Sequence, residues 1–286
     1  TTKPPNHQTT KPPNHQTTKP HKKNDMKKLL TIILAVCAAT IYCHAVTPPF
    51  NVVIMGDSNA ALGGDSCTVE RGWTYWFKQQ ANPLTCISYA RNGATWTNNA
   101  ITKLNLSPTL RGANNDNVIY NQVNRFKENY KNGDQPEPGL IIIAAGSCDG
   151  WLERQRPEMY NMTVEKAFKT PLQDLLMKKA HLVTSLAEAV RFNCEVLRES
   201  FPDATIVLLA PMQTMIAAEP RNSKVADIIG ECGKRLGITV IRLDKELPVK
   251  SSEERIKKRY TTNGSDTSVE GAQLIADKVL EVLGKK

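Results

Sequence analysis

The chain has 286 residues and a formal net charge of +9, a balance that taken whole suggests a nucleic-acid-binding protein. Residues 1–45, however, hold seven of its 37 Lys and Arg residues and one of its 28 Asp and Glu residues. Residues 46–286 therefore carry only about +3 and contain no basic cluster interleaved with aromatics, so a nucleic-acid footprint is excluded. This part of the chain is long enough for one α/β domain with a substantial core.

Two segments precede that domain. Residues 1–16 are two copies of TTKPPNHQ, and a third copy begins at residue 17. Because no large apolar side chain occurs there, residues 1–25 are predicted to be a disordered, low-complexity leader. Residues 26–45 combine a basic start with an apolar run and a small-residue motif ending at Ala45, which is typical of a secretory signal peptide.

The signal-peptide pattern predicts an exported product. Cleavage after Ala45 would leave a periplasmic or extracellular domain, residues 46–286, with no stable membrane span. Two alternatives stay open. The apolar run could remain as a membrane anchor, although it is shorter than the roughly 20 residues of a span. Cys37 could instead carry a lipid, although Val36 is bulky for the position before a lipidated cysteine.

Apolar, β-rich runs alternate with helical patterns through the predicted domain. Strands are predicted at residues 50–55, 84–89, 140–145, 205–210 and 239–243, and helices at 73–80, 118–130, 171–201, 225–236 and 268–283. Residues 97–117 are predicted to be a loop, and residues 151–180 to contain an irregular insertion. Strands that are apolar throughout and separated by helices indicate a parallel sheet covered on both faces. The fold class is therefore a three-layer α/β domain with a five-stranded parallel sheet.

The first predicted strand runs directly into Gly56-Asp57-Ser58-Asn59. A serine at this position presents its hydroxyl on a tight turn and can aim its own N–H at a developing oxyanion. Taken alone, the tripeptide is also explained by an ordinary helix N-cap.

Three further blocks of small and polar residues follow other predicted elements of the domain. They are Arg91-Asn92-Gly93, Gly146-Ser147-Cys148-Asp149, and Asn263-Gly264-Ser265-Asp266 ahead of Gly271. In order and spacing, the four blocks resemble those of the SGNH/GDSL family of serine ester hydrolases. The resemblance covers most of residues 50–283. It implies the flavodoxin-like SGNH hydrolase fold, with the strand order 2-1-3-4-5 and the strand from residue 50 at the centre.

The resemblance also implies roles for individual residues. Ser58 would be the nucleophile, and the N–H groups of Ser58 and Gly93 would form the oxyanion hole. Cys148 stands where the family has an asparagine donor, Asp266 where it has the base histidine, and Asn263 where it has the aspartate that orients this histidine. A thiol is a weak donor, and an ordinary Asp, with a pKa of about 3.9, is a poor base toward serine. Burial and a nearby carboxylate would raise that pKa.

Other assignments of the chemistry are less favourable. His181 is the only histidine of the predicted domain, and it falls in the helix predicted at 171–201, away from the strand ends, which favours a surface or packing role. Cys148 as a nucleophile would lack a histidine to activate it. A metal site built on Asp57, Cys148 and Asp266 is disfavoured for the same lack of a histidine. No metal and no cofactor are expected.

Two functions are consistent with these residues. The first is an exported ester hydrolase acting on acyl or acetyl esters, carbohydrate-linked ones included. The second is a catalytically silent module that uses the same pocket to bind glycans or other extracellular ligands. The predicted pocket residues are Asp57, Asn59, Asp149, Trp96 and Trp151, with the two tryptophans at the pocket mouth unless they are buried in the core.

The sequence supports fewer conclusions about the remaining tryptophans and about the cysteines. Trp73 and Trp76 fall inside a predicted helix and are expected to pack against the core. The predicted domain has an odd number of cysteines without zinc-site spacing, namely Cys67, Cys86, Cys148, Cys194 and Cys232. An exported chain could pair some of them, and the sequence alone leaves the pairing open.

Overall fold

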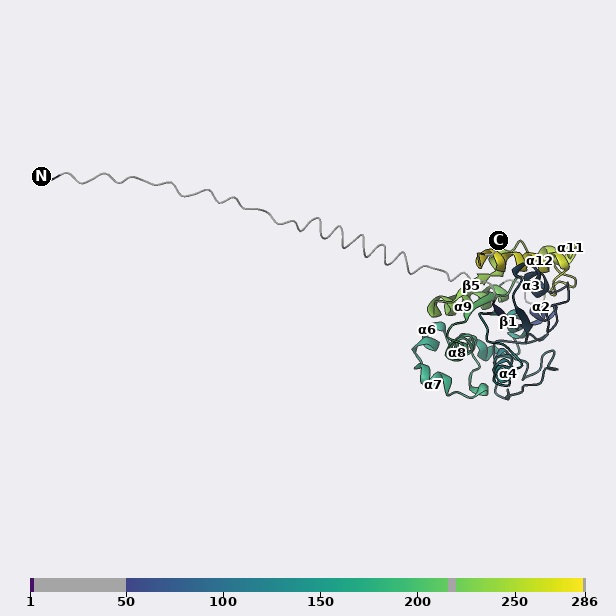
Figure 1. The fold of residues 1–286 in the computed structure, drawn as a ribbon, viewed down its shortest axis with the longest axis horizontal. Coiled ribbons are helices and arrows are strands. Elements are labelled where there is room, and N and C mark those ends of the chain that lie inside the picture. Colours follow the sequence, from purple (N-terminus) through teal and green to yellow (C-terminus); the bar gives the residue numbers. More distant parts are fainter. Residues whose placement is uncertain (3–49, 216–219, 285–286) are drawn as a thin grey trace. The chain divides into compact units, whose positions relative to one another are not determined.

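The computed structural model describes residues 1–2, 50–215 and 220–284 (Figure 1). The predicted signal peptide, the rest of the predicted leader and Cys37 lie outside the described residues. The chain divides into two units, Thr1–His44 and Ala45–Lys286, and the second unit contains the predicted domain. Within the described ranges, no helix is both long enough and apolar enough to cross a membrane.

Five strands form a single parallel sheet, and the predicted strand order is confirmed as β2-β1-β3-β4-β5. The strands are β1 (Asn51–Gly56), β2 (Thr85–Ser88), β3 (Leu140–Ala144), β4 (Thr205–Ala210) and β5 (Thr239–Arg242). The middle strand is β3, and the strand from residue 50, expected at the centre, lies next to it. β3 is buried at every position, which explains why its sequence is apolar without alternation. Gly56 pairs with Ala144 in register, so β1 and β3 end at the same level and bring the blocks that follow them together.

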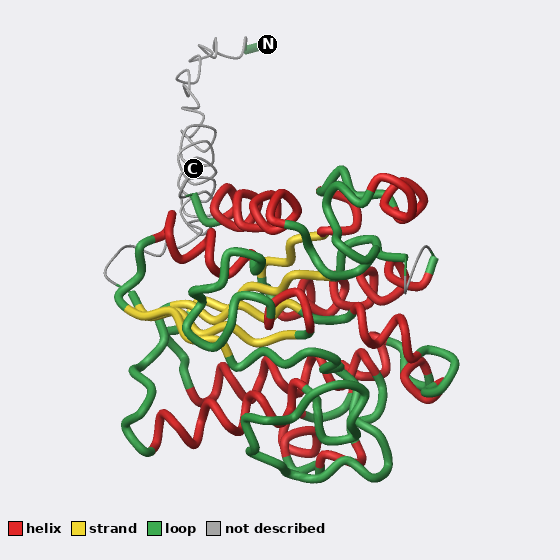
Figure 2. The backbone as a smooth tube through the Cα atoms, turned by 90° about the vertical axis from the view of Figure 1, so that its right-hand side faces the viewer, coloured by secondary structure: helices red, strands yellow, loops and turns green. Residues whose placement is uncertain are grey.

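The sheet lies between two layers of helices, as Figure 2 shows. Alternate strand residues face opposite sides, so Val53 and Ile141 belong to one core and Val52 and Ile142 to the other. The first core is covered by α4 (Ile119–Lys131), α8 (Leu186–Ser200) and α9 (Arg221–Leu236), the second by α3 (Trp73–Ala81) and α12 (Val269–Val282). The predicted three-layer α/β class is therefore confirmed.

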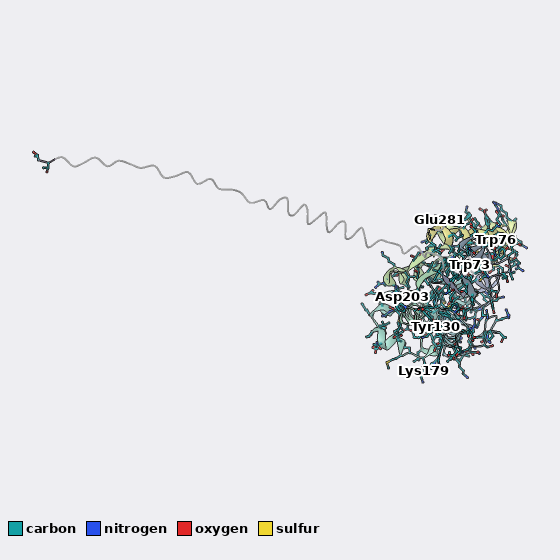
Figure 3. The ribbon with its side chains drawn as sticks, viewed as in Figure 1. Trp73, Trp76, Tyr130, Lys179, Asp203 and Glu281 are labelled. Atoms are coloured by element: carbon teal, nitrogen blue, oxygen red, sulfur yellow. The ribbon has the colours of Figure 1, made fainter. Side chains whose placement is uncertain are left out.

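α3 carries two tryptophans, Trp73 and Trp76, which are labelled in Figure 3. Their environments differ. Trp73 is buried and packs edge-on against Phe77, as the helical pattern predicts. Trp76 is half-buried, and its indole N–H donates a hydrogen bond to the carbonyl oxygen of Glu70 at 2.9 Å.

The long helix predicted over residues 171–201 is wrong. The segment contains α7 (Leu172–Leu176), the 3₁₀ turn η2 (Ala180–Leu182) and only then α8. The break has a local cause, because Ser185 caps α8 and its hydroxyl accepts a hydrogen bond from the Glu188 N–H at 3.3 Å.

Several short elements surround the strand ends. They are α2 (Ser58–Ala61), α5 (Ser147–Leu152), η1 (Pro157–Tyr160), α6 (Val164–Lys169), α10 (Leu243–Glu246) and α11 (Ser251–Lys257). The predicted irregular insertion corresponds to η1, α6 and α7. The loop predicted at residues 97–117 forms neither helix nor strand, and side-chain amides hold it in place: the Asn117 amide, for example, donates to the Gly112 carbonyl oxygen at 3.0 Å.

Candidate active site

The turn after β1 requires glycine at position 56. A Cβ atom on Gly56 would lie 2.1 Å from the Ala144 carbonyl oxygen and 2.9 Å from the Ala60 Cβ. Directly after it, Asp57 caps α2, and its carboxylate accepts a hydrogen bond from the Asn59 N–H at 3.3 Å. Ser58 is thereby placed as the first residue of α2, at the carboxyl end of the central part of the sheet.

A buried amide from α4 fixes this turn from the other side. The Gly56 N–H donates to Gln122 Oε1 at 2.8 Å, and Gln122 Nε2 donates back to the Gly56 carbonyl oxygen at 2.9 Å. Sequence reasoning missed Gln122. A signal was present, because Gln122 falls on the apolar face of the predicted helix, between Ile119 and Val123, where a polar side chain needs a partner.

The structure brings the first block into contact with each of the others. The Arg91 N–H donates to the Gly56 carbonyl oxygen at 3.1 Å. The Ser147 N–H donates to the Asp57 carboxylate at 3.2 Å.

The fourth block is held by Asn59. The Asn59 side-chain oxygen accepts from the Thr267 N–H at 3.0 Å, and its amide nitrogen donates to the Ser265 carbonyl oxygen at 3.3 Å. Because Asp266 lies between these two partners, the clamp fixes its backbone beside the nucleophile turn.

Asp149 ties the second block to the third and is itself fully buried. Its carboxylate accepts the Trp96 N–H at 2.9 Å, the Thr97 N–H at 3.0 Å and the Thr97 hydroxyl at 2.8 Å. Burial raises the pKa of Asp149, while these hydrogen bonds act in the opposite direction. With no exposed surface, Asp149 shapes the wall of the site and does not itself face a ligand, which corrects its expected place in the pocket.

The two tryptophans expected at the pocket mouth differ in exposure. Trp96 has no exposed surface, and its indole N–H donates to the Ala145 carbonyl oxygen at 3.1 Å. The expectation that it lines the mouth is wrong, because Asp149 draws its backbone into the core. Trp151, on α5, is 43% exposed, and its role as a ligand-stacking residue stays a prediction.

Cys148 contacts the predicted nucleophile. Its thiol lies close enough to the Ser58 side chain for Ser58 to affect its pKa, and the residue is 7% exposed. Burial first, and then the charges of Asp57 and Asp149, raise the pKa of Cys148 well above its ordinary value, while the interaction with Ser58 opposes the shift. The charge of Asp266 acts on this thiol as well. A thiol held neutral in this way is no nucleophile near neutral pH, and it can offer only a weak S–H donor.

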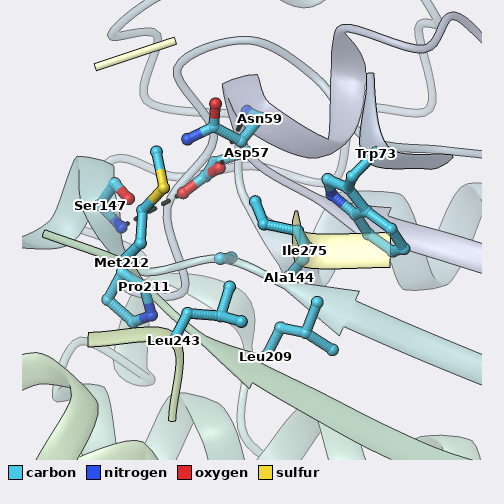
Figure 4. A pocket seen from close by; sticks show the side chains of 11 residues that line it. Asp57, Asn59, Trp73, Ala144, Ser147, Leu209, Pro211, Met212, Leu243 and Ile275 are labelled. Atoms are coloured by element: carbon cyan, nitrogen blue, oxygen red, sulfur yellow. Dashed lines mark hydrogen bonds between the residues drawn. The ribbon is translucent and has the colours of Figure 1, made fainter. Parts of the chain in front are cut away.

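The pKa of the Asp57 carboxyl is unusually high. Burial raises its pKa from 3.8 to about 7, against the opposing effect of the Asn59 and Ser147 N–H groups, and the charge of Asp149 adds to the rise. Figure 4 shows the cavity beside this carboxyl, which has a volume of about 20 Å³ and mostly apolar walls that include Leu209 and Met212. Such a volume holds about one water molecule.

Asn263 and Asp266 form a compact turn. The Asn263 amide donates to the Asp266 carboxylate at 3.0 Å, and the Asn263 side-chain oxygen accepts from the N–H groups of Ser265 at 2.9 Å and Asp266 at 2.8 Å. Asn263 therefore holds Asp266 by a direct side-chain contact, in the positions where the resembling family has an aspartate and a histidine.

Gly93 occupies a conformation and a space that suit glycine alone. Its φ is +85°, and a Cβ atom would lie 2.5 Å from the carbonyl carbon of Gly112. The 97–117 loop reaches this position because the Gly112 N–H donates to the Asn92 carbonyl oxygen at 2.8 Å.

His181 lies in η2, apart from the four blocks. It lines an open cavity with residues 100–103 and 114–116, and neither Ser58 nor Asp266 is among the lining residues. In the part of the chain that the structure describes, no group of three or more His, Cys, Asp and Glu residues is arranged to hold a metal ion.

The doubly covered parallel sheet, with its polar blocks at the carboxyl ends of the strands, defines the fold of the SGNH/GDSL hydrolases, and the chain is a fold relative of that class. Among solved structures, it is similar to proteins described as GDSL-like lipases from Bacteroides ovatus (16% identity, TM-score 0.52, 84% of this chain and 100% of that chain) and Bacteroides uniformis (18%, 0.51, 83% and 97%).

A protein from Lactobacillus plantarum is also similar, with 12% identity, a TM-score of 0.54, and coverage of 83% of this chain and 98% of that chain. No protein-family model and no curated protein sequence matches the chain. At these identities the comparisons establish the fold alone.

Proposed function

We propose that the protein is a serine ester hydrolase of the SGNH type, with Ser58 as nucleophile and with low turnover. The observation that carries this proposal is the convergence of four separate blocks on the turn that holds Ser58, where hydrogen bonds from Arg91, Ser147 and Thr267 tie the other three blocks to the first. An ordinary N-cap is an alternative explanation of Asp57-Ser58, but capping alone does not require the other three blocks to converge on it.

The proposed reaction follows the usual two steps of acyl transfer. Ser58 Oγ attacks the ester carbonyl carbon, and its proton passes to the Asp266 carboxylate, directly or through one water molecule. The oxyanion that forms accepts hydrogen bonds from the N–H groups of Ser58 and Gly93 and from the Cys148 thiol. Collapse of the intermediate releases the alcohol and leaves an acyl group on Ser58, which water then hydrolyses to regenerate the serine and release the acid.

Low turnover follows from two substitutions at this site. A neutral thiol at position 148 is a weaker donor than a side-chain amide. At the position of the family's base histidine, the Asp266 carboxylate already accepts the hydrogen bond that the Asn263 amide donates, and a carboxylate is ordinarily a weaker base than an imidazole. The same two observations favour the second candidate function, a binding module with the fold and pocket of a hydrolase and no turnover.

Residues next to Cys148 are proposed to bind the part of the substrate beyond the ester. Trp151 is exposed one turn further along α5, where its ring can stack on a sugar. The residues that follow Trp151 line an open cavity of about 450 Å³, a volume in the range of small-molecule sites. The cavity is lined by Glu153, Arg154, Pro157, Tyr160 and Arg221. We therefore propose carbohydrate-linked acyl or acetyl esters as the substrate class.

Export is a separate part of the proposal and rests on the sequence pattern of residues 26–45. N-terminal sequencing of the protein produced from Met26 in its natural host should find cleavage close to Ala45. A soluble cytoplasmic product that retains residues 29–41 would refute export and would leave the proposal for Ser58 unaffected.

Covalent labelling tests the nucleophile without requiring rapid turnover. An alkyl fluorophosphonate phosphonylates an activated serine, with loss of fluoride, and mass spectrometry of the digested protein identifies the modified residue. We expect slow labelling of Ser58, suppressed by an excess of acetylated sugar, and no labelling in Ser58→Ala. Ser147, which begins α5 at the same strand edge, is the internal control. Labelling of Ser147 at an equal rate, or no labelling of Ser58 in the folded protein, would contradict the assignment.

A further inference from the structure

The segment after the nucleophile helix is fastened along the edge strand β2. The Ser88 N–H donates to the Asp65 carbonyl oxygen at 2.7 Å, and the Lys78 ammonium donates to the Ser66 carbonyl oxygen at 2.8 Å. These contacts bring Cys67, in the segment between α2 and α3, against Cys86, in β2. Both cysteines belong to the same hydrophobic core, on the α3 face of the sheet.

The two thiols interact inside that core. Cys67 has no exposed surface and Cys86 is 3% exposed, both are free thiols in the structure, and each is the largest influence on the pKa of the other. Cys67 also has a φ of +53°, a conformation that residues with a Cβ atom rarely adopt and that persists only where the surroundings enforce it. The backbone contacts of the segment and this enforced conformation place Cys67 beside Cys86.

The other buried cysteines provide the contrast. Cys194 and Cys232 are each buried, but the Cys232 thiol donates to the Ala187 carbonyl oxygen at 3.6 Å. Cys232 raises the pKa of Cys194, but only as a smaller cause than burial. Among the cysteines of the described ranges with a shifted pKa, Cys67 and Cys86 are the two for which another thiol is the largest cause.

We infer that Cys67 and Cys86 form a disulfide bond when the protein folds under oxidising conditions. The inference relies on the proposed export for the natural oxidising compartment. It does not depend on Ser58 being a nucleophile, so the two proposals fail separately.

The bond would form by ordinary thiol–disulfide exchange. The thiolate of one of the two cysteines attacks a low-molecular-weight disulfide such as oxidised glutathione, which releases one thiol. The second cysteine then loses its proton and attacks the protein sulfur of the mixed disulfide, which releases the second thiol and leaves the Cys67–Cys86 bond.

The bond would close a loop of about 20 residues that contains all of α3. This loop begins just beyond α2, so the bond fastens the segment that follows Ser58 to the sheet. Reduction should lower the melting temperature by roughly 6–12 °C, the shift expected for a loop of this length in a domain of this size.

Peptide mapping of the full chain provides the test. The chain is refolded with oxidised glutathione, its remaining thiols are alkylated, and it is digested with trypsin without reduction. We expect the peptide Gln79–Arg91 joined to the peptide Leu29–Arg71, with fragment spectra that place the bond at Cys67 and show Cys37 and Cys43 alkylated. Cys194 and Cys232 should also be recovered in alkylated form. Recovery of alkylated Cys67 and Cys86 from the folded protein, or a cross-link between other cysteines, would overturn the inference.

A pair of variants provides the second measurement. In Cys194→Ala the melting temperature should still fall on reduction, whereas in Cys67→Ala it should not respond to the reductant. Equal responses of the two variants would also overturn the inference, whatever their absolute stability.

Discussion

The buried Asp57 carboxyl predicts how stability changes with pH. Its pKa is raised from 3.8 to about 7 in the folded protein, chiefly by burial. Between these two pKa values the folded state binds a proton that the unfolded state has released. The free energy of unfolding therefore falls as the pH rises through this window, and the loss is complete above the folded pKa.

The size of the effect follows from the shift. One pKa unit corresponds to about 1.36 kcal/mol, so the difference of about three units is worth roughly 4 kcal/mol in all. About two of these units lie between about pH 5 and about pH 8, which predicts a loss of about 2.7 kcal/mol over this range. The burial of Asp149 raises its pKa too and adds a loss of the same sign, so the contribution of Asp57 has to be isolated by substitution.

Urea denaturation of the natural protein and of the Asp57→Asn variant isolates the contribution of Asp57 to the pH dependence of stability. The difference in the free energy of unfolding between the two proteins should shift by about 2.7 kcal/mol between about pH 5 and about pH 8, in favour of the variant at the higher pH. Comparing each protein with itself at two pH values cancels the pH-independent cost of the amide, which cannot accept from both the Asn59 and the Ser147 N–H. A difference that is constant with pH, or that favours the natural protein at high pH, would refute the assignment of a raised pKa to Asp57.

Two further substitutions test the framework of the site. Gly56→Ala should destabilise the fold by roughly 4 kcal/mol or more, because its Cβ atom would lie 2.1 Å from a β3 carbonyl oxygen, whereas Gly133→Ala, with open space around it, should cost only about 1–2 kcal/mol in urea denaturation. Equal midpoints for the two variants would contradict the close approach. Asp149→Ala leaves three buried donors without their acceptor and should lower the free energy of unfolding by about 3–5 kcal/mol. The control Asp203→Ala, at an exposed position, should change it by less than about 0.5 kcal/mol. A small effect at Asp149 would mean that water replaces its carboxylate.

The three inner strands were predictable from the sequence because they are almost fully buried. Residues 50–55, 140–145 and 205–210 are mostly apolar and are followed by Gly56, Gly146 and Pro211, so the pattern predicts both the strand and its end. The edge strands β2 and β5 are partly exposed and lack such a stop signal. The helix predicted at 171–201 was wrong because the apolar periodicity continues through α7, η2 and α8, and only the cap at Ser185 marks where α8 begins.

The contacts between the blocks were predictable in outline and not in detail. The end of each parallel strand lies at the same edge of the sheet, which is enough to predict that the blocks meet. The partners that hold them, such as Gln122 for Gly56 and Asn59 for the fourth block, join residues far apart in the chain and have no local sequence signal. Trp96 is the sharpest example, because its burial depends on hydrogen bonds to Asp149 from a different block.

The most direct test of the proposed chemistry is the rate at which the protein hydrolyses a simple aryl acetate before and after the missing groups are restored. The triple variant Cys148→Asn, Asn263→Asp and Asp266→His supplies an amide donor, a base and a partner that orients the base. A lost donor costs about 10²–10³ and a lost base about 10²–10⁴, and the two act as a unit. Turnover should therefore rise by at least about 10³-fold, and Ser58→Ala should abolish the gain. A natural protein that already hydrolyses the ester rapidly, loses this activity on Asp266→Asn and gains nothing from Asp266→His would contradict the proposed low turnover, because Asp266 would then be a working base.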